Sequence, residues 1–168
     1  MCRIDSEQAW KALGDFSNYL RGNMDALSNS DMIHFSNELK HIQAYLQLEK
    51  MRMGEELNVV YDIQENNFFL PPLTIQPIVE NAVKHGLFNK DGGGTVTLHT
   101  RRENDNIIIE VTDDGVGFDP DAPYEYDPHH AHIGLINVKS RLEKMLKGEM
   151  IINSVINEGT TIKIIIKK

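Results

Sequence analysis

The sequence contains a single cysteine, Cys2, and it has neither a long apolar run nor an excess of basic residues. One cysteine cannot form an internal disulfide, which favours a reducing compartment. No stretch approaches the roughly 18–20 apolar residues needed to cross a bilayer. The formal net charge of -8 argues against binding to duplex DNA or RNA, which usually needs a strong basic face. A polyanionic nucleotide would therefore have to be met by local donors.

The 168 residues give room for one substantial domain and an appendage. Apolar residues recur at three-four spacing over about 7–28 and about 32–53, which predicts two helices separated by a polar break. Their apolar seams predict that they pack on each other or on a partner outside this chain. We therefore expect a helical arm over residues 1–54.

After Gly54 the pattern changes, and residues 55–168 predict a second unit. Alternating and β-branched residues predict five strands, which cover 57–63, 95–100, 107–112, 150–155 and 160–166. Two helices are predicted between them, over 72–87 and 134–147, the second ended by Gly148. The predicted architecture is a helical arm followed by an α/β sandwich.

The helix predicted over 72–87 presents two different faces. Asn81, Lys84 and His85 share a polar face at positions i, i+3 and i+4. The Asn81 carboxamide oxygen can bind a hard cation such as Mg²⁺, Lys84 can neutralise phosphate charge, and His85 can donate to a phosphate. The alternative is a solvated polar face without a ligand. Another face is apolar and is expected to bury against the sheet through Ile75, Ile78, Val79 and Ala82.

A carboxylate and two glycines follow the strand predicted over 107–112, as Asp113-Asp114-Gly115-Val116-Gly117. The Asp113 carboxylate can accept a hydrogen bond from the exocyclic amine of adenine, whereas guanine presents a carbonyl there. Gly115 and Gly117 would let the backbone approach a base closely. Taken alone, the motif would be an ordinary Asp-Gly turn.

The helix predicted to open at Gly134 follows a proline-rich segment, 118–131, that lacks periodicity. Free amides and the positive dipole end of such a helix suit phosphate oxygens. The preceding segment is predicted to be a lid or a disordered loop. Three histidines in or next to this segment also raise a zinc hypothesis: His129, His130 and His132. The pattern lacks cysteines and a fourth ligand at fixed spacing.

These motifs, together with the turn Gly159-Thr160, resemble in order the N box and glycine boxes of the GHKL ATPase superfamily, which includes gyrase B, Hsp90, histidine kinases and MutL. The runs 70–86, 38–52 and 134–142 are similar to LytS/YehU-type bacterial sensor histidine kinases. The resemblance implies an α+β fold: a two-layer sandwich with a mixed, mostly antiparallel sheet packed on helices.

The resemblance also implies roles for individual residues. Asn81 would be the Mg²⁺ ligand and Asp113 the adenine acceptor in an ATP site. The other residues expected in this site are Lys84, His85, Gly115, Gly117, Ile133, Gly134, Leu135 and Thr160. The implied function is a histidine kinase that relays its phosphoryl group to a response regulator receiver domain. The family implies a homodimer joined through a helical bundle, in the cytoplasmic domain of a plasma-membrane receptor.

Three departures from the family pattern qualify this expectation. No histidine lies in a Pro-His-Phe-Leu-Phe-Asn-like acceptor run, so the chain is expected to be a fragment of a longer receptor that cannot autophosphorylate alone. Pro77 stands where gyrase-like hydrolases hold a water-activating glutamate, which fits a kinase. Only Gly134 remains of a box that often has several glycines.

No catalytic residue is assigned with certainty from the sequence. Glu80 is a candidate for orienting the incoming imidazole, although it points about 100° away from Asn81 on an α-helix. Two rival functions stay open: an anti-sigma-type serine kinase, and a nucleotide-binding adaptor without catalysis.

Overall fold

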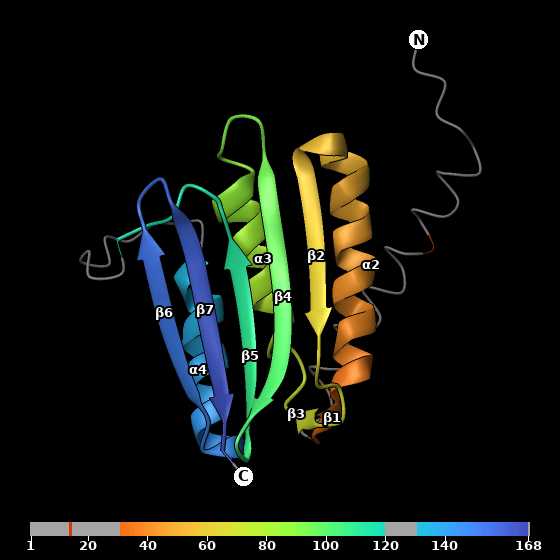
Figure 1. Ribbon diagram of the computed structural model, residues 1–168, viewed down its shortest axis with the longest axis vertical. Coiled ribbons are helices and arrows are strands. Elements are labelled where there is room, and N and C mark those ends of the chain that lie inside the picture. The colour runs from red at the N-terminus through yellow and green to blue at the C-terminus, as the bar shows by residue number, and fades with distance from the viewer. Residues whose placement is uncertain (1–13, 15–30, 120–130, 168) are drawn as a thin grey trace.

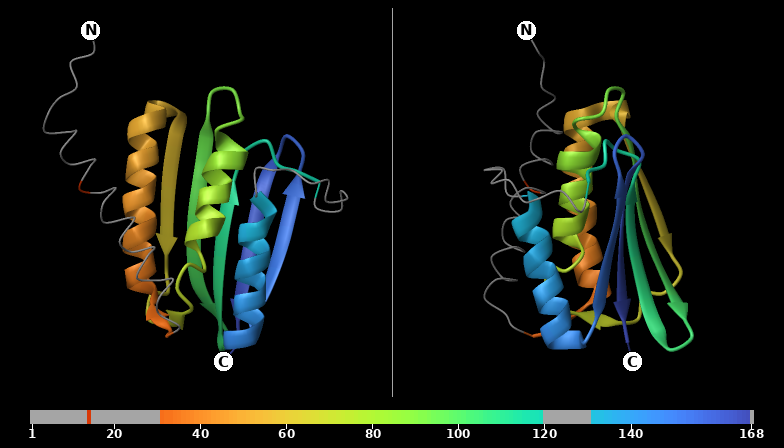
Figure 2. Two further views of the ribbon diagram at one scale, coloured as in Figure 1. Left: turned by 180° about the vertical axis from the view of Figure 1, so that it is seen from behind. Right: turned by 90° about the vertical axis from the view of Figure 1, so that its left-hand side faces the viewer.

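The computed structural model describes residues 31–119 and 131–167, together with Gly14; the side chains of 131–133 lie outside this description. The helix predicted over 7–28 falls outside the described residues, as does most of the lid segment with His129 and His130. The described part forms two layers. A five-stranded sheet carries three helices on one face (Figure 1, Figure 2). The helices are α2 (Phe35–Met53), α3 (Gln76–Asn81) and α4 (Ala131–Leu146).

The sheet is mixed, with its strands in the order β2-β4-β5-β7-β6. Only β2 and β4 pair in parallel within it, and the other neighbours are antiparallel. The predicted α+β sandwich with a mostly antiparallel sheet is therefore confirmed. The strands are β2 (Leu57–Ile63), β4 (Gly94–Glu103), β5 (Asn106–Asp113), β6 (Glu149–Val155) and β7 (Gly159–Ile166).

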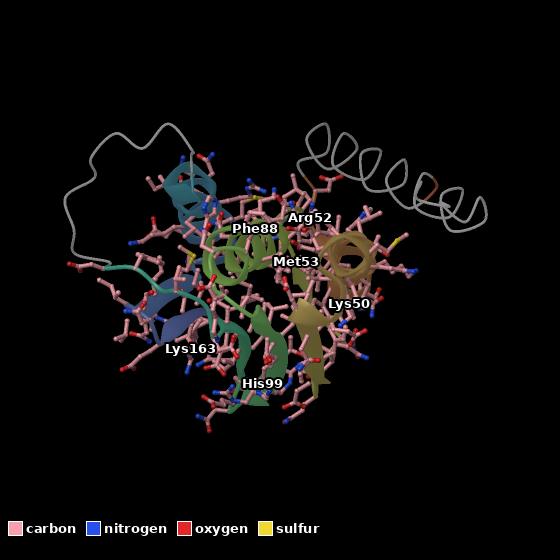
Figure 3. The ribbon with its side chains drawn as sticks, turned by 90° about the horizontal axis from the view of Figure 1, so that it is seen from above. Lys50, Arg52, Met53, Phe88, His99 and Lys163 are labelled. Atoms are coloured by element: carbon pink, nitrogen blue, oxygen red, sulfur yellow. The ribbon has the colours of Figure 1, made fainter. Side chains whose placement is uncertain are left out.

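Alternation along the strands separates the core from the open face. In β7, Ile162 and Ile164 are buried under the helices, whereas Lys163 between them is not. Figure 3 shows Lys163 and His99 on the face of the sheet that lies away from the helices. The register places Asp113 at the end of β5 opposite Thr160 at the start of β7. The pairing of β5 with β7 thus brings Asp113 and Thr160 side by side.

Helix α2 packs into the core of the sandwich. Its buried apolar residues Phe35, Ile42, Tyr45 and Leu46 belong to the same hydrophobic cluster as the sheet. The Phe35 ring stacks on Phe68 with 4.7 Å between centroids. The described part of the predicted arm is therefore packed on the sheet. In the described ranges, no helix is both long and apolar enough to span a membrane.

Three short elements had no counterpart in the sequence-based prediction. Strands β1 (Ile33–His34) and β3 (Phe69–Leu70) pair with each other near the lower ends of α2 and β2 (Figure 1). A 3-10 turn, η1 (Gly54–Glu56), links α2 to β2. Two residues are too few to reveal a period of two, so these strands leave no readable pattern.

The boundaries of two predicted helices are corrected. The helix predicted over 72–87 begins at Gln76, because Leu73 takes a left-handed φ of 56° that interrupts helical geometry. It then continues from Ala82 as a π-helix, η2 (Ala82–Leu87). The helix predicted to open at Gly134 starts at Ala131, since no helix-breaking residue separates the two positions.

Candidate nucleotide-binding site

A cavity of about 210 Å³ lies among α3, η2, the loop after β5, strand β7 and α4. Its walls combine apolar side chains with a small number of polar groups, as ligand sites usually do. Asn81 and Asp113, which were predicted to face a common cleft, both line it. The lining residues are Ile78, Asn81, Ala82, His85, Gly86, Asn89, Val111, Asp113, Gly117, Phe118, Leu135, Thr160 and Ile162.

The π-helix changes which side chains point toward the cavity. In η2 the Phe88 N–H donates to the Val83 carbonyl at 2.9 Å, an i to i+5 bond. A π-turn holds more residues than an α-turn, so it shifts the faces that α-helical spacing predicts. Asn81 and His85 line the cavity, but Lys84 does not. The predicted shared face of these three residues is therefore split.

Lys84 lies on the side of this helix that faces α2. Its ammonium donates to the Glu80 carboxylate at 3.0 Å and lies 5.8 Å from the centroid of the Tyr45 ring. Glu80 also accepts a hydrogen bond from Gln76 Nε2 at 2.9 Å. Phosphate binding by Lys84 stays a prediction, and it requires the ammonium to leave Glu80. The same placement directs Glu80 away from the cavity lining.

Two glycines bring η2 and the loop after β5 into backbone contact. A Cβ on Gly115 would overlap the backbone of Gly86, and a Cβ on Gly86 would overlap the Asp113 carboxylate. The Val116 N–H donates to the Gly86 carbonyl at 3.1 Å and fixes this approach. Both positions require glycine, and this packing presents Asp113 to the cavity.

Asp113 is a buried carboxylate, 5% exposed, whose position is set by backbone amides. Its Oδ1 accepts from the Gly115 N–H at 2.9 Å. Burial raises the pKa of Asp113 to about 6, while backbone hydrogen bonds from Gly115 and Thr160 lower it. The negative charge of Asp114 adds to the increase, and Lys90 opposes it. At neutral pH the group is an ionised acceptor in a largely apolar cavity, which suits a ligand amine.

Asp114, the next residue, has a structural role instead. Its Oδ1 accepts from the Thr95 N–H at 2.9 Å and pairs with the Lys90 ammonium at 3.2 Å. The side chain is half exposed and does not line the cavity. Of the two adjacent carboxylates, only Asp113 can therefore contact a ligand there.

The far wall of the cavity is joined to the β6–β7 hairpin through Ser154. Its hydroxyl accepts from the Phe118 N–H at 2.9 Å and lies 2.9 Å from the Thr160 hydroxyl. Gly117 has a φ of 58°, and a Cβ there would overlap the Val155 carbonyl oxygen. The loop that carries the predicted glycines is thus held between η2 and this hairpin.

Helix α4 contributes Leu135, which is 6% exposed and lines the cavity. Gly134 lies beside α3, where a Cβ would meet Pro77 Cβ at an ordinary 3.9 Å. The Ile133 side chain lies outside the described residues. Of the two described residues, Leu135 lines the cavity and Gly134 does not.

Sequence reasoning missed several cavity residues as members of the site. Gly86 follows His85 directly, and Asn89 donates from Nδ2 to the His85 carbonyl at 3.2 Å. Phe118 directly follows the predicted glycine motif. If the residues after Asn81 are spaced as in a π-turn, Gly86 and Asn89 fall on the side of the site. No sequence pattern predicts a π-turn, so these residues were missed.

The described residues fit a magnesium ion that is bound mainly by its nucleotide. Among them, no cluster of three or more histidine, cysteine, aspartate or glutamate side chains could hold a metal. Asn81, whose side chain carries one neutral amide oxygen, lines the cavity. Mg²⁺ commonly keeps several waters and binds through one or two protein oxygens plus substrate phosphates, so one amide oxygen beside a triphosphate is a suitable donor set.

The fold agrees with the comparisons with known proteins. Residues 73–168 match the histidine kinase-, DNA gyrase B- and HSP90-like ATPase family, and residues 1–57 match the histidine kinase family. Since the first match covers more than half of the chain, the chain belongs to the histidine kinase-, DNA gyrase B- and HSP90-like ATPase family. The GHKL resemblance is therefore confirmed.

Similar proteins include named sensor kinases. The chain is 36% identical to the protein YwpD of Bacillus subtilis, over 99% of this chain and 61% of YwpD. It is 36% identical to the sensor histidine kinase YpdA of Escherichia coli, over 88% of this chain and 26% of that kinase. The sensor protein LytS of Oceanobacillus iheyensis is 28% identical over 87% of this chain and 26% of its own length. The chain thus spans less than two thirds of each of these relatives.

Solved structures with the same fold are histidine kinase domains. The histidine kinase domain of a blue-light activated kinase from Erythrobacter litoralis superposes with a TM-score of 0.63 at 17% identity, covering 98% of this chain and 81% of that one. The mycobacterial sensor histidine kinase MprB gives a TM-score of 0.62 at 16% identity, with 82% and 97% covered. At these identities the similarity establishes the shared fold.

Proposed function

We propose that this chain is the ATP-binding catalytic part of a LytS-type sensor histidine kinase. The observation that carries the proposal is that Asn81 and the buried carboxylate Asp113 line one cavity. Membership of the ATPase family and the sensor kinases among the relatives support it.

Adenine would bind at the Asp113 end of the cavity. Its exocyclic amine would donate to the carboxylate, while the apolar walls formed by Ile78, Leu135 and Ile162 would cover the ring faces. Gly86 and Gly115 have no side chains, and their close packing leaves room for the Asp113 carboxylate. Guanine would place a carbonyl against Asp113 and leave the acceptor unpaired, so the site would prefer ATP over GTP.

The triphosphate would extend toward Asn81 and His85. Bound Mg²⁺ would supply charge neutralisation on the phosphate oxygens, and Asn81 would contribute one ligand to it. A histidine nitrogen on an acceptor helix would form a bond to the γ-phosphorus as the bond to the β,γ-bridging oxygen breaks and ADP leaves. The chain itself would position the nucleotide rather than react with it.

The phosphoryl group would then pass to an aspartate of a response regulator receiver domain. In its whole context the chain would work as the cytoplasmic domain of a membrane receptor, dimerised through a helical bundle. These partners follow from the LytS-type kinase assignment and share its test.

The proposal is tested by mixing the chain with γ-labelled ATP, Mg²⁺ and a separately made acceptor helix that carries the histidine. Acid-labile label on that histidine is expected, and the Asn81→Ala variant should reduce it strongly. Label on serine would support the serine kinase alternative. Nucleotide binding without any transfer would support the adaptor, and it would contradict the kinase proposal.

A further inference from the structure

Glu38 on α2 is a buried carboxylate outside the candidate site. It is 1% exposed, and its Oε1 accepts from the backbone N–H groups of Ile75 at 2.6 Å and Gln76 at 3.1 Å. Helix α3 begins at Gln76, and the preceding Ile75 has no side-chain acceptor with which to cap it. The N-terminal amides of α3 are thus capped by a side chain from another helix, 37 residues earlier in the chain for Ile75.

Helix α3 is only six residues long and bears Asn81 at its last position. Even together with η2, which continues it to Leu87, the helical segment is too short to be stable alone, so its placement depends on what holds its ends. Gln76 and Asn81 lie five residues apart, about 7.5 Å along an α-helix. A shift of the capped end is therefore transmitted to the Asn81 carboxamide over little more than one turn.

Arg141 on α4 holds the same turn from the opposite side. Its guanidinium donates to the carbonyls of Pro72 and of Leu73, the latter at 3.4 Å. Glu38 binds amides of this turn and Arg141 binds its carbonyls, so side chains from two flanking helices fix the entry to α3. In the described residues, Arg141 is also the charged group that acts on Glu38 electrostatically.

Helix α2 contacts the far end of the same helical segment as well. The Arg52 guanidinium lies over the Phe88 ring, 4.7 Å from its centroid, and Phe88 directly follows η2 (Figure 3). Between the two ends, Lys84 approaches the Tyr45 ring of α2. The segment from Gln76 to Phe88 is therefore held against α2 at both ends.

We propose that Glu38 is a positioning residue for the nucleotide site, which sets the start of α3 from α2 and thereby the place of Asn81 in the cavity. The inference rests on the proposed function, because it assigns Glu38 an effect on nucleotide binding. It makes α2 the element through which a displacement of the preceding chain reaches the magnesium ligand. Asp113 is held by Gly115 and Thr160 on the sheet side, and Leu135 and Ile162 also lie outside α3. Of the three apolar walls of the adenine end only Ile78 belongs to α3, so this end depends on Glu38 less than Asn81 does.

The test compares MgATP with adenosine as calorimetric probes of the full chain. For Glu38→Ala we expect the Kd for MgATP to rise about tenfold, as for one displaced contact, and the Kd for adenosine to change by less than about twofold. Glu38→Gln keeps an acceptor oxygen and should recover most of the MgATP affinity. Glu110→Gln, which removes a carboxylate paired with Arg101 on the open face of the sheet, is the matched control and should leave both affinities unchanged.

Equal losses for MgATP and adenosine in a folded Glu38→Ala variant would assign Glu38 to general stability and overturn the inference. Unchanged affinities for both probes would overturn it too. If Glu38→Ala does not fold, the same two Kd values are measured for Glu38→Gln. We then expect the affinity for MgATP alone to fall about threefold. A wild-type chain that binds neither probe would overturn the proposed function itself, an outcome distinct from a failure of Glu38 alone.

Discussion

A buried carboxylate from another element contacts each end of the helical segment that carries Asn81, and the two carboxylates have different surroundings. Asp113 lies against η2 and faces the cavity, whereas Glu38 faces the amides at the start of α3. Burial raises the pKa of both groups, to about 6 for Asp113 and to about 7 for Glu38. A raised pKa therefore does not identify a ligand site. The surroundings of the carboxylate distinguish the two roles: a carboxylate that faces a cavity can bind a ligand, and one that faces a helix terminus caps the helix.

The largest effect on stability is expected at Gly115, where the loop after β5 is in backbone contact with η2. Gly115→Ala should lower the free energy of unfolding by about 3 kcal/mol, because its Cβ would overlap the Gly86 backbone. Urea denaturation measures the change. The matched control is Gly134→Ala, which has room for a Cβ within α4 and should raise stability by about 0.5–1 kcal/mol. A Gly115→Ala loss under about 1 kcal/mol would contradict the tight approach of η2 to this loop.

Removing the carboxylate at the cavity should affect ligand binding more than folding. Asp113→Ala should weaken adenosine and MgATP about 10- to 100-fold, the effect of one lost hydrogen bond to a buried charged acceptor. Calorimetric titration gives both constants. Glu38→Ala should leave adenosine binding nearly unchanged. Similar adenosine losses in the two variants would abolish the distinction between the two carboxylates.

The pH dependence of stability sharpens the same comparison. Glu38 has its pKa raised from 4.5 to about 7, so the folded state holds the proton more tightly than the unfolded state. Its contribution to stability is therefore fully present below pH 4.5 and declines as the pH rises toward about 7, after which it is constant. Relative to Glu38→Gln, the wild type should lose about 2–3 kcal/mol between about pH 5 and about pH 8.

Urea denaturation of both proteins across this pH range gives the difference directly. Subtracting the free energy of unfolding of the variant from that of the wild type removes the contributions of other titrating groups, including Asp113. Parallel stability curves for the two proteins would show that Glu38 does not titrate in this window, contrary to its buried position.

The smallest effect is expected at Lys84, which the structure places on the α2 side of the helix. Lys84→Ala should change stability by less than about 0.5 kcal/mol, because the Lys84 side chain is about half exposed and its pair with Glu80 is an i, i+4 pair at the helix surface. With the ammonium held by Glu80, the Kd for MgATP should change less than about twofold. An affinity loss of tenfold or more would instead establish that Lys84 swings to the phosphates.

The strands were well predicted from the sequence, since alternation and β-branched residues carry a strong local signal. The predicted strand over 57–63 coincides with β2. Helix boundaries were less accurate. The entry to α3 depends on a left-handed Leu73 and on Glu38, and the contact of Glu38 with Ile75 joins residues 37 positions apart. No local pattern encodes such a contact.

The candidate site was predicted in part for the same reason. Asn81 and Asp113 belong to short motifs, and the structure brings both to one cavity. The exclusion of Lys84 from the lining depends on the π-helix at Ala82–Leu87, whose wider turn changes the face that follows Asn81. The need for glycine at position 86 appears only when Asp113 lies against it in three dimensions.

The most direct test of the account is the denaturation of the wild-type chain with MgATP and with MgGTP. At about 100 times its Kd, MgATP should raise the free energy of unfolding by about 2.7 kcal/mol. MgGTP at the same concentration should give a clearly smaller increase, because its base presents a carbonyl to Asp113. Equal stabilisation by both nucleotides, or none by MgATP, would contradict the assignment of the cavity between Asn81 and Asp113 as an ATP site.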